Sequence, residues 1–155
     1  MHETVKIDSK DIIMKKSIFQ KIKETIGSLS PETGGIIGIC DNIICEFYFD
    51  NTAYSNADCY IPNDVVINEV LEEWALNNVQ FYGIVHSHPY GQTKLSYNDI
   101  IYARQILDLI SNTYASIYFP IIQSEFDGKP FEVYSYVIKK MKSEYKVFSV
   151  NLTII

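Results

Sequence analysis

Residues 86–99 read HSHPYGQTKLSYND, and expectations for the whole chain start from this stretch. It follows an apolar run, residues 79–85, that is typical of a buried strand. Successive side chains of a strand point to opposite faces, so His86 and His88 project to one side and Ser87 to the other. The two imidazoles are therefore expected close enough to share one ion.

The second half of the stretch predicts a turn and the start of a helix. Pro89 and Gly91 end the strand and turn the chain. Ser96 has the character of a helix N-cap, and Asp99, three residues later, falls in the first helical turn. A turn that folds the helix start back to the strand end brings the Asp99 carboxylate to the imidazoles.

Two histidines and an aspartate make a three-ligand site. Catalytic zinc commonly has three protein ligands and a water in the fourth, open position, whereas structural zinc has four protein ligands. Each fragment has an ordinary alternative, because a His-x-His pair can face solvent and Ser-x-x-Asp can be a capping box and no more. Strand, turn and helix start together favour a catalytic zinc held by His86, His88 and Asp99.

The pattern His-x-His, seven residues, Ser, two residues, Asp resembles the signature of the JAMM (MPN-plus, JAB-domain) metalloproteases. His86, His88, Ser96 and Asp99 match that signature position by position. The resemblance implies one Zn²⁺ on the two histidines and the aspartate, with a bound water as its fourth ligand. It also implies that Ser96 donates a hydrogen bond to the oxyanion of the reaction.

The same family carries a glutamate upstream, at the start of a strand rich in glycine and aliphatic residues. Glu32 in PETGGIIG, residues 31–38, occupies that place. A glutamate before two glycines is ordinarily an exposed turn residue, but glycines also let a strand approach a metal site closely. With the downstream motif present, Glu32 is the expected general base. The resemblance extends from about Asp11 to Ile138.

The resemblance implies a single α/β domain over residues 1–155, an MPN/JAB-like fold in which a curved mixed β-sheet is flanked by helices. Apolar spacing predicts helices that start near Ser17, at Pro62-Asn63-Asp64 and after Ser96, with Gly27 ending the first. Strands are expected over residues 5–7, 12–14, 35–40, 43–50, 60–61, 79–88, 114–123 and 131–138, and residues 146–155 form either a last strand or a terminal arm. Turns are expected at Asp41-Asn42 and Asp127-Gly128.

Bulk composition excludes some classes of protein. The formal net charge of −6 argues against nucleic-acid binding, and no apolar run approaches the roughly 20 residues of a membrane span. The N-terminal residues lack a signal-peptide pattern, which favours the cytoplasm. The cysteines are interpreted as structural, with Cys40 and Cys45 as small buried hydrophobes and Cys59 without a partner at Cys-x-x-Cys spacing.

The expected function is that of a deubiquitinase-like zinc isopeptidase or peptidase of the compact prokaryotic type. It would cleave after the C-terminal tail of a ubiquitin-like or sulfur-carrier protein, as precursor processing or as deconjugation in a bacterial ubiquitin-like, antiphage system. That tail is expected to add as a strand beside residues 79–88 or beside the Gly34 strand. The alternatives are a non-catalytic MPN-type scaffold and a RadC-type, DNA-associated relative. Partners are the ubiquitin-like or sulfur-carrier protein and its conjugates, without nucleic acid or membrane, and a homodimer is left open.

Overall fold

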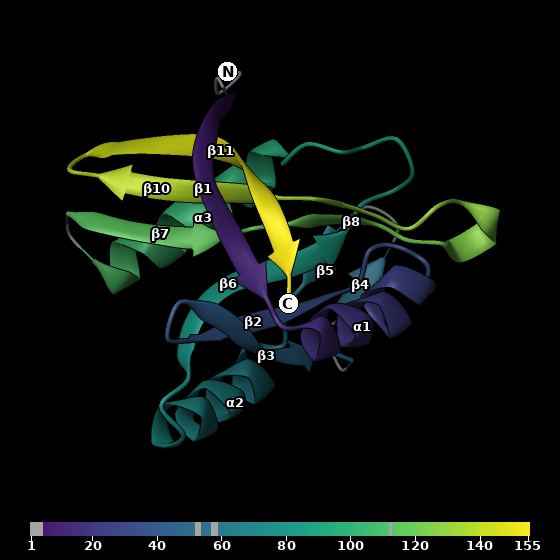
Figure 1. The fold of residues 1–155 in the computed structure, drawn as a ribbon, viewed down its shortest axis with the longest axis horizontal. Helices are drawn as coiled ribbons and strands as arrows, with labels where there is room; N and C mark the ends of the chain where they lie inside the picture. The colour runs from purple at the N-terminus through teal and green to yellow at the C-terminus, as the bar shows by residue number, and fades with distance from the viewer. Residues whose placement is uncertain (1–4, 52–53, 57–58, 112) are drawn as a thin grey trace.

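Seven strands close into a ring in the computed structural model (Figure 1). The structure describes the backbone of residues 5–51, 54–56, 59–111 and 113–155, and the side chains of residues 11–51, 60–111 and 113–155. In spatial order the ring runs β2 (Gly34–Cys40), β3 (Ile43–Phe49), β1 (Val5–Met14), β11 (Glu144–Ile154), β10 (Tyr136–Met141), β7 (Tyr114–Tyr118) and β6 (Gln80–Ser87). Antiparallel pairing of β6 with β2 then completes it.

This ring corrects the predicted architecture. An α/β domain with a curved mixed sheet flanked by helices is wrong, because the sheet curls until its strands meet in a closed barrel. The helices are short: α1 (Lys16–Glu24), α2 (Asp64–Leu76) and α3 (Tyr97–Ile110). A period-two pattern shows which side chains are buried but not how far a sheet coils, so the sequence left closure undetermined.

Closure brings β6 against β7 at a glycine. Gly83 pairs with Tyr118, and a Cβ atom at Gly83 would lie 1.9 Å from the Tyr118 carbonyl oxygen. Only glycine allows the two backbones this approach, which is the positional use of glycine within strands. Gly83 is therefore part of what permits the barrel to close beside the candidate site.

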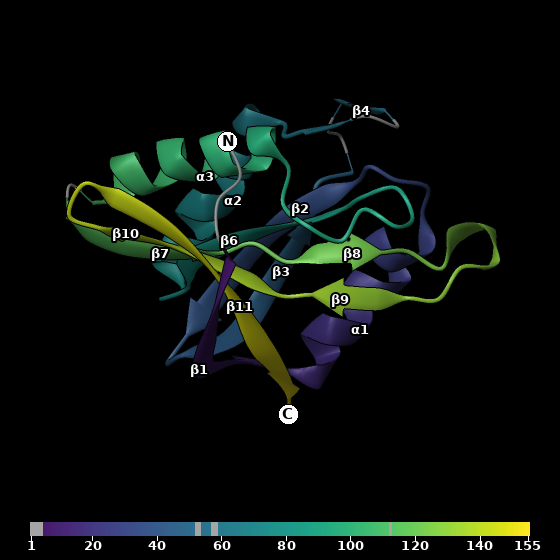
Figure 2. The ribbon, with the colours of Figure 1, turned by 90° about the horizontal axis from the view of Figure 1, so that it is seen from above.

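Alternate residues of β2 and β6 supply two separate cores. Ile36 and Ile84 belong to the core that includes side chains of α2 and α3. Ile37 and Val85 belong to the other core, which includes side chains of α1. Figure 2 shows α1 and α3 on opposite sides of the strands. Because both faces of β6 are covered, its sequence is a continuous apolar run rather than an alternating one.

The sheet extends beyond the ring on the side of the candidate site. β8 (Ile121–Gln123) pairs in parallel with the end of β6, and β9 (Glu132–Tyr134) pairs with β8. A separate two-stranded ribbon consists of β4 (Tyr54–Asn56) and β5 (Cys59–Ile61). The predicted single strands over residues 114–123 and 131–138 are thus each two strands, and residues 144–154 form the last strand rather than an arm.

Turns and caps depend on local chemistry, and they agree with prediction more closely than the sheet architecture does. Asp41 and Asn42 both have positive φ, 50° and 65°, as a tight hairpin turn requires. α2 begins at Asp64 as predicted, with Asn63 as its N-cap. The start of α1 was predicted wrongly, because Lys15 rather than Ser17 is its N-cap, and the helix ends at Glu24, before Gly27.

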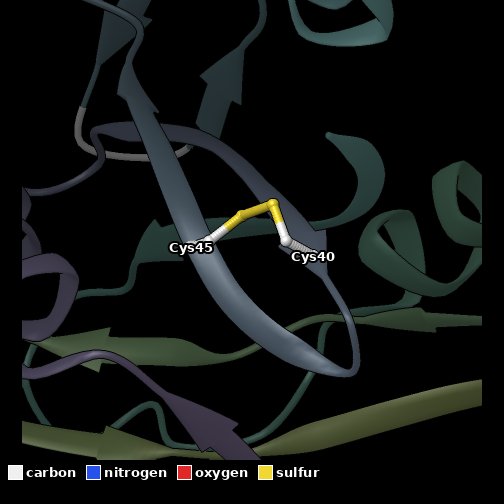
Figure 3. The surroundings of a disulfide bond; sticks show 2 residues. All are labelled: Cys40 and Cys45. Carbon is white, nitrogen blue, oxygen red and sulfur yellow. A yellow bond between two sulfur atoms is a disulfide. The ribbon is translucent and has the colours of Figure 1, made fainter. Parts of the chain in front are cut away.

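Cys40 and Cys45 are joined by a disulfide across the β2–β3 hairpin (Figure 3). Their Cα atoms lie 5.9 Å apart, within the usual range for a disulfide. The prediction that they are small buried hydrophobes is therefore wrong, since they are bonded and only partly buried. The side chain of Cys59 lies outside the described side chains. Among the described helices, none has both the length and the apolar character needed to cross a bilayer.

Candidate metal centre

The end of β6 is fixed between two neighbouring strands, and it carries both histidines. His86 pairs with Gly34 of β2 on one side and with Ile121 of β8 on the other. The His88 amide donates a hydrogen bond of 3.1 Å to the Ile122 carbonyl, which continues the ladder past the last β6 residue. The two histidines are only 2% and 4% exposed. Their backbone positions are thus set by long-range pairing.

The ring nitrogens and the Asp99 carboxylate converge as predicted. The Nε2 atoms of His86 and His88 lie 2.9 Å apart. Asp99 places Oδ1 at 3.1 Å from the His86 Nε2 and Oδ2 at 3.1 Å from the His88 Nε2. Sequence reasoning placed all three side chains at one point, and the structure brings all three together.

The predicted capping box at the start of α3 is confirmed. The Asp99 amide donates to Ser96 Oγ at 3.1 Å, and the Ser96 amide donates to Asp99 Oδ2 at 2.8 Å. The same Oδ2 faces His88, so the box aims the carboxylate at the imidazoles. One conformation of Ser96 and Asp99 can therefore both cap the helix and direct the carboxylate to a metal site.

Glu32 lies beside the histidines, as expected. It is buried, and one of its carboxylate oxygens lies within 4.8 Å of ligand atoms of both rings. Two potential ligand sets consequently share His86 and His88, one completed by Asp99 and the other by Glu32. The two Asp99 oxygens each lie 3.1 Å from one imidazole nitrogen, which favours Asp99 as the third ligand and leaves Glu32 for the role of a base.

Ser87 was not predicted to have a role, and it anchors the segment that carries Glu32. Its amide donates to the Thr33 carbonyl at 2.9 Å, and its Oγ accepts from the Thr33 amide at 3.1 Å. Ser87 faces away from the imidazoles, as strand alternation predicts, and is fully buried. The serine between the two histidines thus fixes the residue next to Glu32.

Burial and the Asp99 carboxylate control the protonation of the cluster. Burial lowers the pKa of His86 below its ordinary value, and the Asp99 carboxylate opposes this only in part. Burial also lowers the pKa of His88, but hydrogen bonding and charge from Asp99 outweigh it, so the net shift is upward. Burial alone would raise the pKa of Asp99, yet the two imidazoles hold it well below its usual range. Asp99 is therefore a carboxylate at neutral pH, as a metal ligand must be.

The donor set fits a divalent zinc. Ligand atoms of a tetrahedral zinc with bonds of about 2.0–2.1 Å lie about 3.3 Å from one another, close to the 2.9 and 3.1 Å found here. Two imidazole nitrogens and a carboxylate are ligands that zinc accepts. Both Nδ1 atoms are buried without a hydrogen bond of good geometry to a described residue, although the Gln92 backbone helps to raise the pKa of His88.

A cavity of about 330 Å³ opens onto these residues. Its polar wall holds the candidate metal ligands together with Glu32, Gln92 and Ser96, and its apolar wall is formed by Tyr60, Ile61, Pro62, Ile84, Tyr102 and Phe119. Such a mixture of an apolar wall and few convergent polar groups is typical of a binding site. The cavity therefore has room for a substrate segment beside the cluster.

Tyr60 is a wall residue that sequence reasoning did not single out. A Cβ atom at Gly34 would lie 2.5 Å from the Tyr60 ring, so the ring rests directly on the β2 backbone. Its hydroxyl donates to Asp50 Oδ2 at 2.8 Å, and the same oxygen accepts from the Asn63 amide at 2.9 Å. Gly34 was the available signal in the sequence, because a glycine there indicated that another group comes close to the strand. Only the tertiary structure shows that this group is the Tyr60 ring.

Comparison with known proteins shows the fold and no more. No protein-family model matches the chain, and no curated protein matches it. A similar solved structure is the solution structure of protein DSY2949 from Desulfitobacterium hafniense, with a TM-score of 0.64 over 92% of this chain and 93% of that chain. The two sequences are 16% identical. At that level the likeness establishes a shared fold, and no activity is transferred by it.

Proposed function

We propose that the chain is a zinc-dependent peptidase or isopeptidase of the JAMM type. One observation carries the proposal: both Nε2 atoms and the Asp99 carboxylate lie within about 3 Å of one another at the cavity, beside a buried glutamate. The proposal rests on this site and its spacing in the sequence rather than on sheet architecture, because one constellation can occur on unrelated folds.

His86, His88 and Asp99 would hold the ion. A catalytic zinc, when bound, supplies a Lewis acid and lowers the pKa of water to about 7. The ligands arrive already oriented, because β2 and β8 fix the end of β6 and the capping box fixes Asp99. Such pre-organisation lowers the entropic cost of ordering the ligand side chains when the metal binds.

Glu32 would move the proton. Its carboxylate takes a proton from the attacking water as the new carbon–oxygen bond forms at the scissile carbonyl. The same proton then passes to the amine nitrogen as the carbon–nitrogen bond breaks, so the carboxylate is regenerated. Burial of Glu32 and the Ser87–Thr33 hydrogen bonds beside it support a fixed position for this base.

Ser96 would stabilise the oxyanion. Its Oγ accepts a hydrogen bond from the Asp99 amide, which leaves the hydroxyl proton available to donate elsewhere. Ser96 also lines the cavity. A single oxyanion donor typically contributes about 3 kcal/mol to the transition state.

The proposed substrate is the C-terminal tail of a ubiquitin-like or sulfur-carrier protein, as a conjugate or a precursor. The expected docking of that tail beside the β6 or β2 strand is wrong, because β6 is paired with β2 on one edge and with β7 and β8 on the other, and β2 is paired with β3 and β6. The tail would instead enter through the cavity mouth. Such a substrate would place the reaction in the cytoplasm, where thiol reductants keep most cysteines reduced.

Intact-mass analysis of a panel of ubiquitin-like and sulfur-carrier fusions tests the proposal. Each fusion is incubated with zinc-loaded protein and, in parallel, with the Glu32→Gln variant. Cleavage directly after the tail by the wild type alone would support the proposed peptidase and identify its substrate class. Full zinc binding with no cleavage of any fusion would favour a scaffold, and salt-sensitive DNA binding would favour the RadC-type alternative.

A further inference from the structure

Gln123, the last residue of β8, is buried and holds the loop between the two halves of the metal motif. Its Oε1 accepts a hydrogen bond of 2.7 Å from the Gly91 amide. Its Nε2 lies at hydrogen-bond distance from three carbonyl oxygens, those of His88 at 3.2 Å, Pro89 at 3.3 Å and Gln92 at 3.2 Å. Gln123 is only 3% exposed. This one side chain thus offers hydrogen-bond partners to backbone groups of the loop from His88 to Gln92.

This loop decides whether the motif can assemble. It leaves the sheet at His88 and leads to Ser96 and Asp99, so its path sets where α3 begins. Gly91 lies in the left-handed region at φ 90°, where residues with a side chain are strained. A turn of this kind has few hydrogen bonds of its own, and in the described loop the Gln92 amide donates to the Pro89 carbonyl at 3.0 Å.

At the Nδ1 atoms of the two imidazoles, the described residues offer little support beyond the Gln92 backbone near His88. Metal-bound histidine rings usually donate their other N–H to a carboxylate or carbonyl, which fixes their orientation. Here neither Nδ1 atom makes a good hydrogen bond to a described residue. The orientation of His88 therefore depends on its own backbone and on that of Gln92, and Gln123 lies at hydrogen-bond distance from the carbonyl oxygens of both.

We propose that Gln123 is a positioning residue for the metal centre, which fixes the His88–Gln92 loop so that His88 and Asp99 meet at one ion. This inference rests on the proposed function for the identity of the ion. The hydrogen bonds to the loop join protein groups alone, so the holding of the loop can be tested separately from any zinc chemistry.

The central variant is Gln123→Met, which has a similar length and volume but can neither accept a hydrogen bond from the Gly91 amide nor donate one to the loop carbonyls. Tyr118→Phe is the matched control, because Tyr118 is fully buried and its hydroxyl bonds Ser135 at 2.7 Å, away from the cavity lining. Gln123→Glu is the second variant, in case the methionine variant does not fold. It keeps the acceptor for the Gly91 amide and removes the amide donors to the three carbonyls.

Three measurements are made on each protein: the Kd for zinc by chelator competition, the visible spectrum of the Co²⁺-loaded protein, and hydrogen exchange of the Gly91 amide without metal. Loss of an outer-shell partner costs about 10–100-fold in metal affinity. We therefore expect the Kd for zinc to rise by about 10–100-fold in Gln123→Met. The spectrum of the Co²⁺-loaded variant should change, and its Gly91 amide should exchange faster. Tyr118→Phe should lower thermal stability and leave all three readouts as in the wild type.

Wild-type zinc affinity in both Gln123 variants would overturn the inference, as would an equal loss of affinity in Tyr118→Phe. A wild-type protein that binds no zinc would instead overturn the proposed function. In that case hydrogen exchange of the Gly91 amide still tests whether Gln123 holds the loop. Faster exchange in Gln123→Met, but not in Tyr118→Phe, would support that role, and unchanged exchange in Gln123→Met would exclude it.

Discussion

The two ends of β2 are built on different principles. At the Cys40 end the chain turns through Asp41 and Asn42 into β3, and a disulfide to Cys45 closes the same few residues (Figure 3). At the Gly34 end, the segment that carries Glu32 meets the end of β6, and Asp99 arrives from the start of α3. The first end is assembled by neighbours in sequence, and the second only by closure of the sheet.

The two ends of β2 should therefore differ in how a substitution affects function. The hairpin at the Cys40 end is held by a turn and a disulfide that lie within a few residues of one another. A cluster drawn from three distant segments depends on each pairing that brings them together. We therefore expect changes at the Gly34 end to abolish metal binding or catalysis, and changes at the Cys40 end to alter stability alone.

The largest effect is expected from His88→Ala. It removes one of the three proposed protein ligands, so the protein should retain no stoichiometric zinc after dialysis and should have background peptidase activity. Metal analysis of the dialysed protein is the measurement. The control is the double variant Cys40→Ser, Cys45→Ser, which should retain zinc, and full occupancy in His88→Ala would contradict the centre as described.

Glu32→Gln should separate catalysis from metal binding. The amide has the size of the carboxylate but cannot take a proton, so kcat should fall by about 10²–10⁴-fold while zinc stays bound. Parallel zinc titrations of Glu32→Gln and Asp99→Asn check the assignment of the third ligand. If Glu32→Gln loses zinc and Asp99→Asn keeps it, the roles of the two carboxylates are exchanged.

Ser96→Ala should have an intermediate effect on both catalysis and stability. Loss of the proposed oxyanion donor is expected to lower kcat by about 10²–10³-fold. Loss of the N-cap of α3 should destabilise the protein by about 1 kcal/mol, measured by urea unfolding. Ser96→Thr keeps a hydroxyl and a capping oxygen and should restore most of both; a threonine variant as inactive as the alanine variant would argue against the hydroxyl as donor.

The smallest effect is expected at the hairpin. Opening the Cys40–Cys45 disulfide should lower the free energy of unfolding by no more than about 2 kcal/mol, because the loop it closes is short and the turn already brings its ends together. Urea unfolding with and without reductant measures this, and zinc titration should give the same Kd in both states. A weaker zinc affinity after reduction would show that the two ends of β2 are coupled.

Part of the candidate site could be predicted because its signals are local. Alternation along one strand put His86 and His88 on one face and Ser87 on the other. The capping pattern put Asp99 in the first turn of α3, where the structure has it. What local signals could not reveal are partners contributed from elsewhere: Gln123 from β8 beneath the loop and Tyr60 from the ribbon against Gly34.

Three features could be read from the sequence, because each depends on backbone chemistry within a few residues: the strand-to-helix motif, the Asp41-Asn42 turn and the cap of α3. Tertiary structure was needed to establish that the sheet closes, since closure depends on coiling and on the approach of β6 to β7 at Gly83. It also decided that two cysteines five positions apart are bonded. Packing energy summed over distant segments settles such questions, and no local pattern encodes that sum.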